Sequence, residues 1–252
     1  MPQADFKTIG VLLGLIAASF LVFGLWPGLD LAVTGWFYTP ETGFLLQGNW
    51  AAEAFRRAVW GASILLLSVA LPALISGLLA WRETCLGLST RLWGGVVVLY
   101  LLGPGLLVDR LLKHHWGRAR PANVIEFGGT ARFTPPHEIS GECARNCSFA
   151  SGEVAGAAAL SICLLVILWN LRSRLPEWLY RTSLAVTLIL PVLIGFQRIA
   201  AGRHFLSDVI LPVLLVALVA AVQSRLLPLR ARGAVGTASR LAVVDIRRDS
   251  PY

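Results

Sequence analysis

Residues 92–121 read LWGGVVVLYLLGPGLLVDRLLKHHWGRARP, an apolar run that ends in a dense basic cluster. The apolar part, 92–112, has about the twenty residues that an α-helix needs to cross a hydrocarbon layer of roughly 30 Å. The next nine residues, 113–121, hold one lysine, two arginines and two histidines. We therefore expect a membrane-spanning helix that delivers positive charge to one surface of the bilayer.

The rest of the chain repeats the apolar part of this pattern, since 56% of its residues are hydrophobic and only 14% are charged. Most of its nine tryptophans lie at or near the ends of apolar blocks, where the headgroup layer favours an indole ring. Runs this long and continuous do not suit the alternating strands of a barrel, so we predict an all-α fold, an integral membrane bundle of six transmembrane helices. The six blocks are 9–26, 58–81, 92–112, 152–171, 183–197 and 206–227.

The arginines outside the basic cluster predict the orientation. The linker after the fourth block carries Arg172, Arg174 and Arg181, and further arginines follow the sixth block and continue through the tail 228–252. Both regions should be cytoplasmic by the positive-inside tendency. The first block could be a signal peptide, but no small-residue cleavage site with a polar flank follows it, and we interpret it as an uncleaved helix. We expect a six-helix domain over 1–227 and a basic, disordered cytoplasmic tail over 228–252. Three segments then face outward: 27–57, 113–151 and 198–205.

The basic cluster is therefore outward-facing, against the positive-inside tendency, which favours a local role for its charge. For Lys113 alone, an ion pair with Asp109 one turn earlier would be a sufficient explanation. Other polar groups are expected at the same outer mouth, however, and a cluster of Lys113, Arg120, Arg198 and Arg203 would suit a dianion, because guanidinium groups match phosphate oxygens.

The stretch RIAAGRHFLSD, residues 198–208, joins the last two blocks. If the last helix begins near His204, Asp208 lies one turn deeper on the same face, where its carboxylate can accept the imidazole N–H. Such a pairing leaves the other ring nitrogen free as a nucleophile or base. A helix-start histidine beside an unrelated acid is the alternative, but an ionisable group inside an apolar span indicates function.

The fourth block opens with ASGE, residues 150–153. Ser151 and Gly152 precede a helix whose free backbone N–H groups would face a phosphate. Gly152 and Gly156 also form a small-residue packing face, which is compatible with the phosphate-binding role.

Two of the four cysteines, Cys143 and Cys147, lie in the same outward-facing segment as the sequence CARNC. One helical turn could bring them together, and a disulfide would fit an oxidising compartment. Two thiols without a second pair are a weak signal for a metal, so we predict none. Cys85 and Cys163 need no role beyond that of small buried hydrophobic residues.

Taken together, these motifs resemble the type 2 phosphatidic acid phosphatase superfamily of membrane lipid phosphatases, whose signature is K-x6-RP, PSGH and SR-x5-H-x3-D. The first motif is complete, from Lys113 to Arg120-Pro121. The second keeps Ser151 and Gly152 but has Ala150 for proline and Glu153 for histidine. The third has Gln197 for serine, followed by Arg198, His204 and Asp208.

The resemblance implies metal-independent and cofactor-free hydrolysis of a lipid phosphate through a phosphohistidine. On this basis His204 attacks phosphorus and Asp208 orients His204. The phosphate would be held by Lys113, Arg120, Arg198, Ser151 and Gly152.

Glu153 departs from the family, where a histidine is expected to protonate the leaving oxygen. Glu153 could be that acid if it carries a proton. Alternatively, it pairs with an arginine while His137, Asn146 or a bound water supplies the proton. The sequence leaves both possibilities open.

The substrate should be a phosphorylated envelope lipid of the bacterial inner membrane, met at the periplasmic face. The phrase NCSFASGE, residues 146–153, is most similar to the lipid A phosphatase-like members. Undecaprenyl diphosphate, phosphatidylglycerol phosphate and phosphatidic acid are alternatives, as is phosphotransfer to an alcohol instead of water. A lipid transporter or a scaffold is disfavoured, because polar groups collect at one face and a scaffold has no use for His204 with Asp208.

Overall fold

The computed structural model describes residues 4–226, and within them six helices are long and apolar enough to cross a membrane. This confirms the predicted all-α bundle of six spans. The predicted tail, 228–252, lies outside the described residues. The spanning helices are α1 (Phe6–Leu25), α3 (Trp50–Leu79), α4 (Thr90–Tyr100) continued by the π-type helix η1 (Leu101–Lys113), α5 (Gly152–Leu171), α6 (Glu177–Ala200) and α7 (Leu206–Leu226).

Shorter elements connect them. Two antiparallel hairpins pair two residues from each strand, and a short helix precedes the first hairpin. These elements are α2 (Gly28–Gly35), β1 (Tyr38–Thr39), β2 (Gly43–Phe44), β3 (Thr84–Cys85), β4 (Leu88–Ser89) and the 3-10 turns η2 (Pro121–Asn123), η3 (Ile125–Phe127) and η4 (Arg172–Arg174).

The second span begins earlier than its apolar block, at Trp50 instead of 58. Asn49 caps the helix by accepting from the backbone N–H of Ala52 at 2.9 Å. The first two turns carry charged residues, so hydropathy alone did not include them in the span. One of these residues is Glu53, which the extra turns deliver to the bundle's end.

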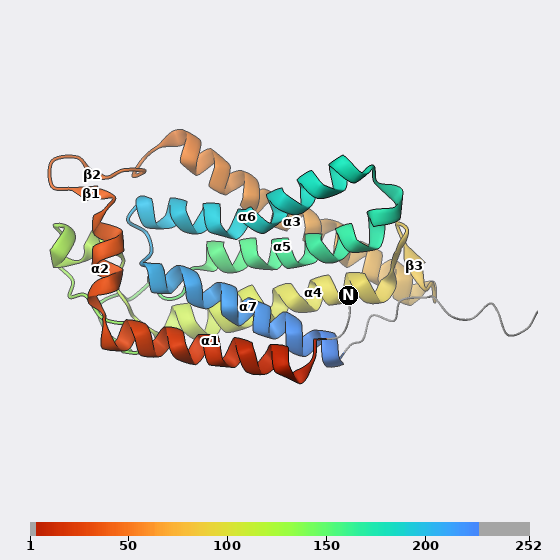
Figure 1. Ribbon diagram of the computed structural model, residues 1–252, viewed down its shortest axis with the longest axis horizontal. Helices are drawn as coiled ribbons and strands as arrows, with labels where there is room; N and C mark the ends of the chain where they lie inside the picture. The colour runs from red at the N-terminus through yellow and green to blue at the C-terminus, as the bar shows by residue number, and fades with distance from the viewer. Residues whose placement is uncertain (1–3, 227–252) are drawn as a thin grey trace, which may run out of the picture.

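The spanning helices lie side by side along the long axis of the molecule (Figure 1). Helix α5 packs against α3, α6, α7 and η1. Its first half is rich in glycine and alanine, and Ala155 and Ala159 are fully buried, because small residues let neighbouring helix backbones approach closely. In contrast, α1 is apolar but mostly exposed, as expected of a helix whose surroundings are lipid.

One end of the bundle gathers the start of α5, the end of α6 and the start of α7, together with α2 and the β1–β2 hairpin (Figure 1). A small hydrophobic core, separate from the packing between the spanning helices, holds the long 114–151 segment at this end. It contains Phe44, Val124, Phe127 and Phe205, whose rings and side chains pack against one another. The outward-facing segments of the sequence prediction therefore meet at a single end.

Candidate active site

Helix α5 presents its N-terminus at the centre of this end. Ser151 is its N-cap: the hydroxyl accepts from the backbone N–H of Val154 at 3.4 Å, and the Ser151 N–H donates to the Asp208 carbonyl at 3.0 Å. The Lys113 amine lies nearby, since a Cβ built on Gly152 would be 3.6 Å from its Nζ. Among the described residues, no ion pair joins Lys113 to Asp109. Backbone N–H groups and one ammonium thus face the same space, as an anion site requires.

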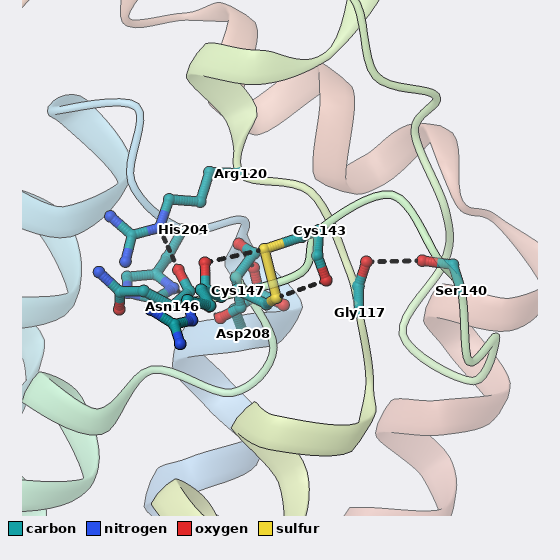
Figure 2. The surroundings of a disulfide bond; sticks show 10 residues. Gly117, Arg120, Ser140, Cys143, Asn146, Cys147, His204 and Asp208 are labelled. Atoms are coloured by element: carbon teal, nitrogen blue, oxygen red, sulfur yellow. Dashed lines mark hydrogen bonds between the residues drawn. A yellow bond between two sulfur atoms is a disulfide. The ribbon is translucent and has the colours of Figure 1, made fainter.

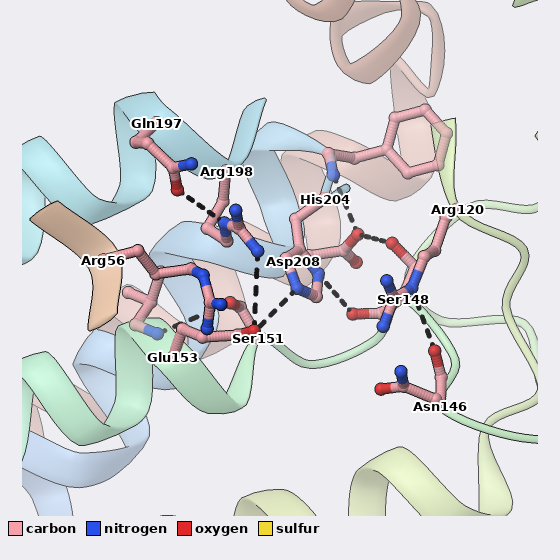
Figure 3. Close-up of polar contacts among 12 residues, drawn as sticks. Arg56, Arg120, Asn146, Ser148, Ser151, Glu153, Gln197, Arg198, His204 and Asp208 are labelled. Atoms are coloured by element: carbon pink, nitrogen blue, oxygen red, sulfur yellow. Dashed lines mark hydrogen bonds and ion pairs between the residues drawn. The ribbon is translucent and has the colours of Figure 1, made fainter. Parts of the chain in front are cut away.

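His204 lies just before α7 and is 1% exposed. Its Nδ1 is 2.8 Å from the backbone carbonyl oxygen of Ser148 (Figure 3). A carbonyl only accepts hydrogen bonds, so Nδ1 carries the proton and Nε2 has a free lone pair in the neutral ring. Nε2 points toward Glu153, whose Oε2 is 3.5 Å away. This is the tautomer that nucleophilic attack by Nε2 requires.

The expected direct hydrogen bond between Asp208 and His204 is wrong. Asp208 Oδ2 accepts from the Ser148 hydroxyl at 2.5 Å and from the Phe205 N–H at 2.9 Å, while Oδ1 accepts from Arg118 Nη1 at 2.6 Å. Helix α7 begins two residues after the histidine, and the Asp208 carboxylate folds back over its first turn as in a capping box. Ser148 therefore lies between Asp208 and His204 (Figure 3).

Arg198 is held between two carboxylates from other helices. Its Nη2 lies 2.8 Å from Glu53 Oε1, and its Nη1 lies 3.5 Å from Glu153 Oε1. Gln197, which stands where the family has serine, accepts from Arg198 Nε at 2.6 Å. Glu53 was not predicted from the sequence, because its helix α3 contributes no motif.

Glu153 occupies the first turn of α5 between Arg198 and His204 (Figure 3). It is within ion-pair distance of both, and its Oε2 is buried without a hydrogen-bond partner in the described residues. The arginine pairing considered from the sequence is thus present, and Glu153 also lies beside the reacting nitrogen of His204. His137 is exposed and lies against Gly24 of α1.

Arg120 supplies a further cation. Its Nε donates to the Asn146 carbonyl at 2.9 Å, and no hydrogen bond within residues 4–226 holds its terminal nitrogens. Burial lowers the pKa of Arg120, and the neighbouring charge of Arg203 lowers it further. A guanidinium fixed at Nε, with its terminal nitrogens available, is suited to bind a phosphate.

A disulfide joins Cys143 and Cys147 beside this group (Figure 2). The loop that it closes contains Asn146, whose carbonyl accepts from Arg120. Ser148, whose carbonyl faces His204, directly follows Cys147. The covalent bridge therefore sits next to two contacts that position the site.

Arg118 is a second residue that the sequence analysis missed, although it lies inside the basic cluster. It is fully buried, and it pairs with Asp30 at 2.8 Å and Asp208 at 2.6 Å. Burial raises the pKa of Asp30. Burial acts to lower the pKa of Arg118, but the charges of Asp208 and Asp30 outweigh it and raise that pKa.

The structure thus brings all eight predicted catalytic and phosphate-binding residues to one end of the bundle. Three cationic side chains and a helix N-terminus surround a histidine with a free Nε2. Within the described residues, no group of three or more His, Cys, Asp and Glu side chains is arranged to hold a metal ion.

Comparison with known proteins gives a consistent result. The chain is 29% identical over 211 residues to a lipid A 4′-phosphatase of Francisella tularensis subsp. novicida, covering 79% of this chain and 87% of that protein. It is 40% identical over 111 residues to a lipid A 4′-phosphatase of Rhizobium leguminosarum, covering 44% of each chain.

Among solved structures, the crystal structure of a transmembrane PAP2 type phosphatidylglycerolphosphate phosphatase from Bacillus subtilis matches with a TM-score of 0.49 and 22% identity. The match covers 89% of this chain and 100% of that one. The PAP2 superfamily matches residues 93–232, which include every motif described above. The chain therefore belongs to the PAP2 superfamily.

Proposed function

We propose that this chain, a multi-pass membrane lipid phosphatase of the PAP2 superfamily, removes the 4′-phosphate of lipid A. The observation that carries the chemistry is the free Nε2 of His204 beside the cationic group and the α5 N-terminus. The substrate is inferred from the Francisella relative, whose similarity extends over most of both chains.

In the proposed reaction Lys113, Arg120 and Arg198 hold the phosphate, and the backbone at Ser151 and Gly152 completes its cradle. His204 Nε2 attacks phosphorus, forming an N–P bond while the bond from phosphorus to the sugar oxygen breaks. A sugar alkoxide is a poor leaving group and needs a proton, for which Glu153 is the candidate donor. Water then cleaves the N–P bond and releases phosphate.

We propose that the end of the bundle that holds the candidate site, called the active end below, faces the periplasm of the bacterial inner membrane. The opposite end carries Arg172, Arg174 and Arg181, which the positive-inside tendency assigns to the cytoplasm. The disulfide at the active end supports this orientation, since disulfides persist in oxidising compartments.

The test is phosphate release by the purified protein from four lipids: lipid A 4′-phosphate, undecaprenyl diphosphate, phosphatidylglycerol phosphate and phosphatidic acid. We expect lipid A to give the highest kcat/KM, with the free 4′-hydroxyl found by mass spectrometry. Phosphate recovered on an added alcohol would indicate phosphotransfer. A higher kcat/KM on another lipid would overturn the substrate assignment.

A further inference from the structure

Arg118 and Asp30 form an ion pair that the proposed reaction does not use. Both side chains are completely buried, and Arg118 also bonds the Thr134 carbonyl at 2.6 Å. Burying charges is expensive, and a buried ion pair is weak evidence for a role in stability alone. The contacts of this pair therefore need a further explanation.

Hydrogen bonds link the pair continuously to the histidine. Arg118 Nη1 donates to Asp208 Oδ1 at 2.6 Å, and Asp208 Oδ2 accepts from the Ser148 hydroxyl at 2.5 Å. The Ser148 N–H donates to the Arg118 carbonyl at 2.8 Å, and the Ser148 carbonyl faces His204 Nδ1. Two groups therefore hold Ser148: the carboxylate of Asp208, which itself bonds Arg118, and the backbone carbonyl of Arg118.

Burial raises the pKa of Asp30, whereas the charge of Arg118 and the hydrogen bonds from Arg118 and Ser207 favour its ionised form. The Ser207 hydroxyl accepts from Arg118 Nη1 at 2.8 Å, so its own proton is donated to Asp30 Oδ2, 2.5 Å away. The Ser207 N–H donates to Asp30 Oδ1 at 2.8 Å. All these contacts bring donors to Asp30, as a carboxylate requires.

The charge count gives Asp30 a specific role. Asp30 and Asp208 carry two negative charges against the single positive charge of Arg118, so the buried group has a net charge of about −1. When Nε2 of His204 bonds to phosphorus while Nδ1 keeps its proton, the ring becomes a cation. Without Asp30, Arg118 and Asp208 would cancel, and the ring would lose the negative charge behind it.

We propose that Asp30 and Arg118 are positioning residues for the attack of His204: Arg118 orients Asp208 and Ser148, and Asp30 keeps the group behind the ring negative. The inference rests on the proposed phosphohistidine reaction. It assigns a role to α2, which lies against α7 outside the signature motifs.

Mutation can separate the effect of the Asp30 charge on the reaction from a purely structural role. Asp30→Asn leaves a neutral group and should lower kcat by about tenfold to a hundredfold, as is typical of residues that act through another, with little change in KM. Rapid-quench measurement should show slower formation of the phosphoenzyme. Asp30→Asn combined with Arg118→Gln restores a net charge of about −1 from Asp208 alone and keeps a side-chain N–H donor that can orient Asp208, so it should recover part of the lost kcat.

Ser161→Ala is the matched control, because it removes a buried hydroxyl that donates to the Thr187 carbonyl at 2.7 Å between α5 and α6, outside the site. It should lower Tm without lowering kcat. The proposal is overturned if Asp30→Asn keeps wild-type kcat, or if the double variant is as slow as Asp30→Asn or slower. If Asp30→Asn alone does not fold, a loss beyond about a hundredfold in a folded double variant overturns it. Absence of hydrolysis by the wild type would instead refute the proposed function.

Discussion

At the scale of single residues, His204 is held through Nδ1 while its Nε2 stays free for reaction. His204 and Asp208 both lie within the signature motif, yet they are connected through Ser148. Its carbonyl accepts from His204, and its hydroxyl donates to Asp208. The roles of these residues should therefore be separable by mutation.

His204→Gln should abolish phosphate release, because no other group supplies the attacking nitrogen. Asp208→Asn should retain a trace, at most about 1% of wild-type kcat, since the ring remains while its support and charge are disturbed. Steady-state kinetics on extracted, folded protein distinguishes the two variants. Wild-type-like turnover by His204→Gln would remove this residue from the mechanism.

Glu153→Gln tests the origin of the leaving-group proton, because glutamine keeps the shape and hydrogen bonding of glutamate but cannot give up a proton. If Glu153 is the acid, hydrolysis of a sugar phosphate should slow by about a hundredfold or more, while an activated phosphoanhydride should be affected much less. The comparison requires kcat/KM on both substrates. Equal losses on both, or no loss on either, would leave Glu153 as a partner of Arg198 only.

At the scale of elements, five helix ends and one disulfide-closed loop make the site: the starts of α3, α5 and α7 and the ends of η1 and α6. Helix α3 extends two turns beyond its apolar block to bring Glu53 against Arg198. The loop closed by Cys143 and Cys147 presents the Asn146 carbonyl to Arg120.

Cys147→Ser should lower both the stability of the protein and the precision with which the loop positions Arg120. The closed loop is short, so the free energy of unfolding should fall by only about 2 kcal/mol at most. Because Arg120 loses a fixed acceptor, kcat/KM should fall by about tenfold or more. Thermal unfolding and kinetics measure the two effects, and Cys85→Ser, at the opposite end, is the control that should change neither. Two free thiols at 143 and 147 in the oxidised protein, found by mass spectrometry, would contradict this account.

At the scale of the whole molecule, the two ends of the apolar bundle differ in their cysteines and in their charged residues. The active end carries the disulfide and the cations proposed to bind phosphate, and the other end carries Cys85 and the arginines of the α5–α6 linker. This polarity has a direct consequence for labelling in intact cells.

A membrane-impermeant maleimide should label Ile139→Cys, whose native side chain is 67% exposed at the active end, and should leave Cys85 unlabelled until the membrane is opened. The expected orientation places only the active end outside the cytoplasmic membrane. Labelling by mass shift distinguishes the two positions. Labelling of Cys85 alone in intact cells would reverse the proposed orientation.

The sequence by itself determined the six spans and was enough to predict the residues that we propose for the phosphate site. Span length, the tryptophans and the spacing from Lys113 to Arg120 are local properties of the chain, since the bilayer fixes helix length and each motif lies beside one helix end. Only the tertiary structure decided which group touches which. Ser148 meets His204 across 56 positions, Arg118 meets Asp30 across 88, and Glu53 meets Arg198 across 145. No local periodicity encodes such contacts, because they arise when separate helices pack and each buried charge takes the partner that packing brings to it.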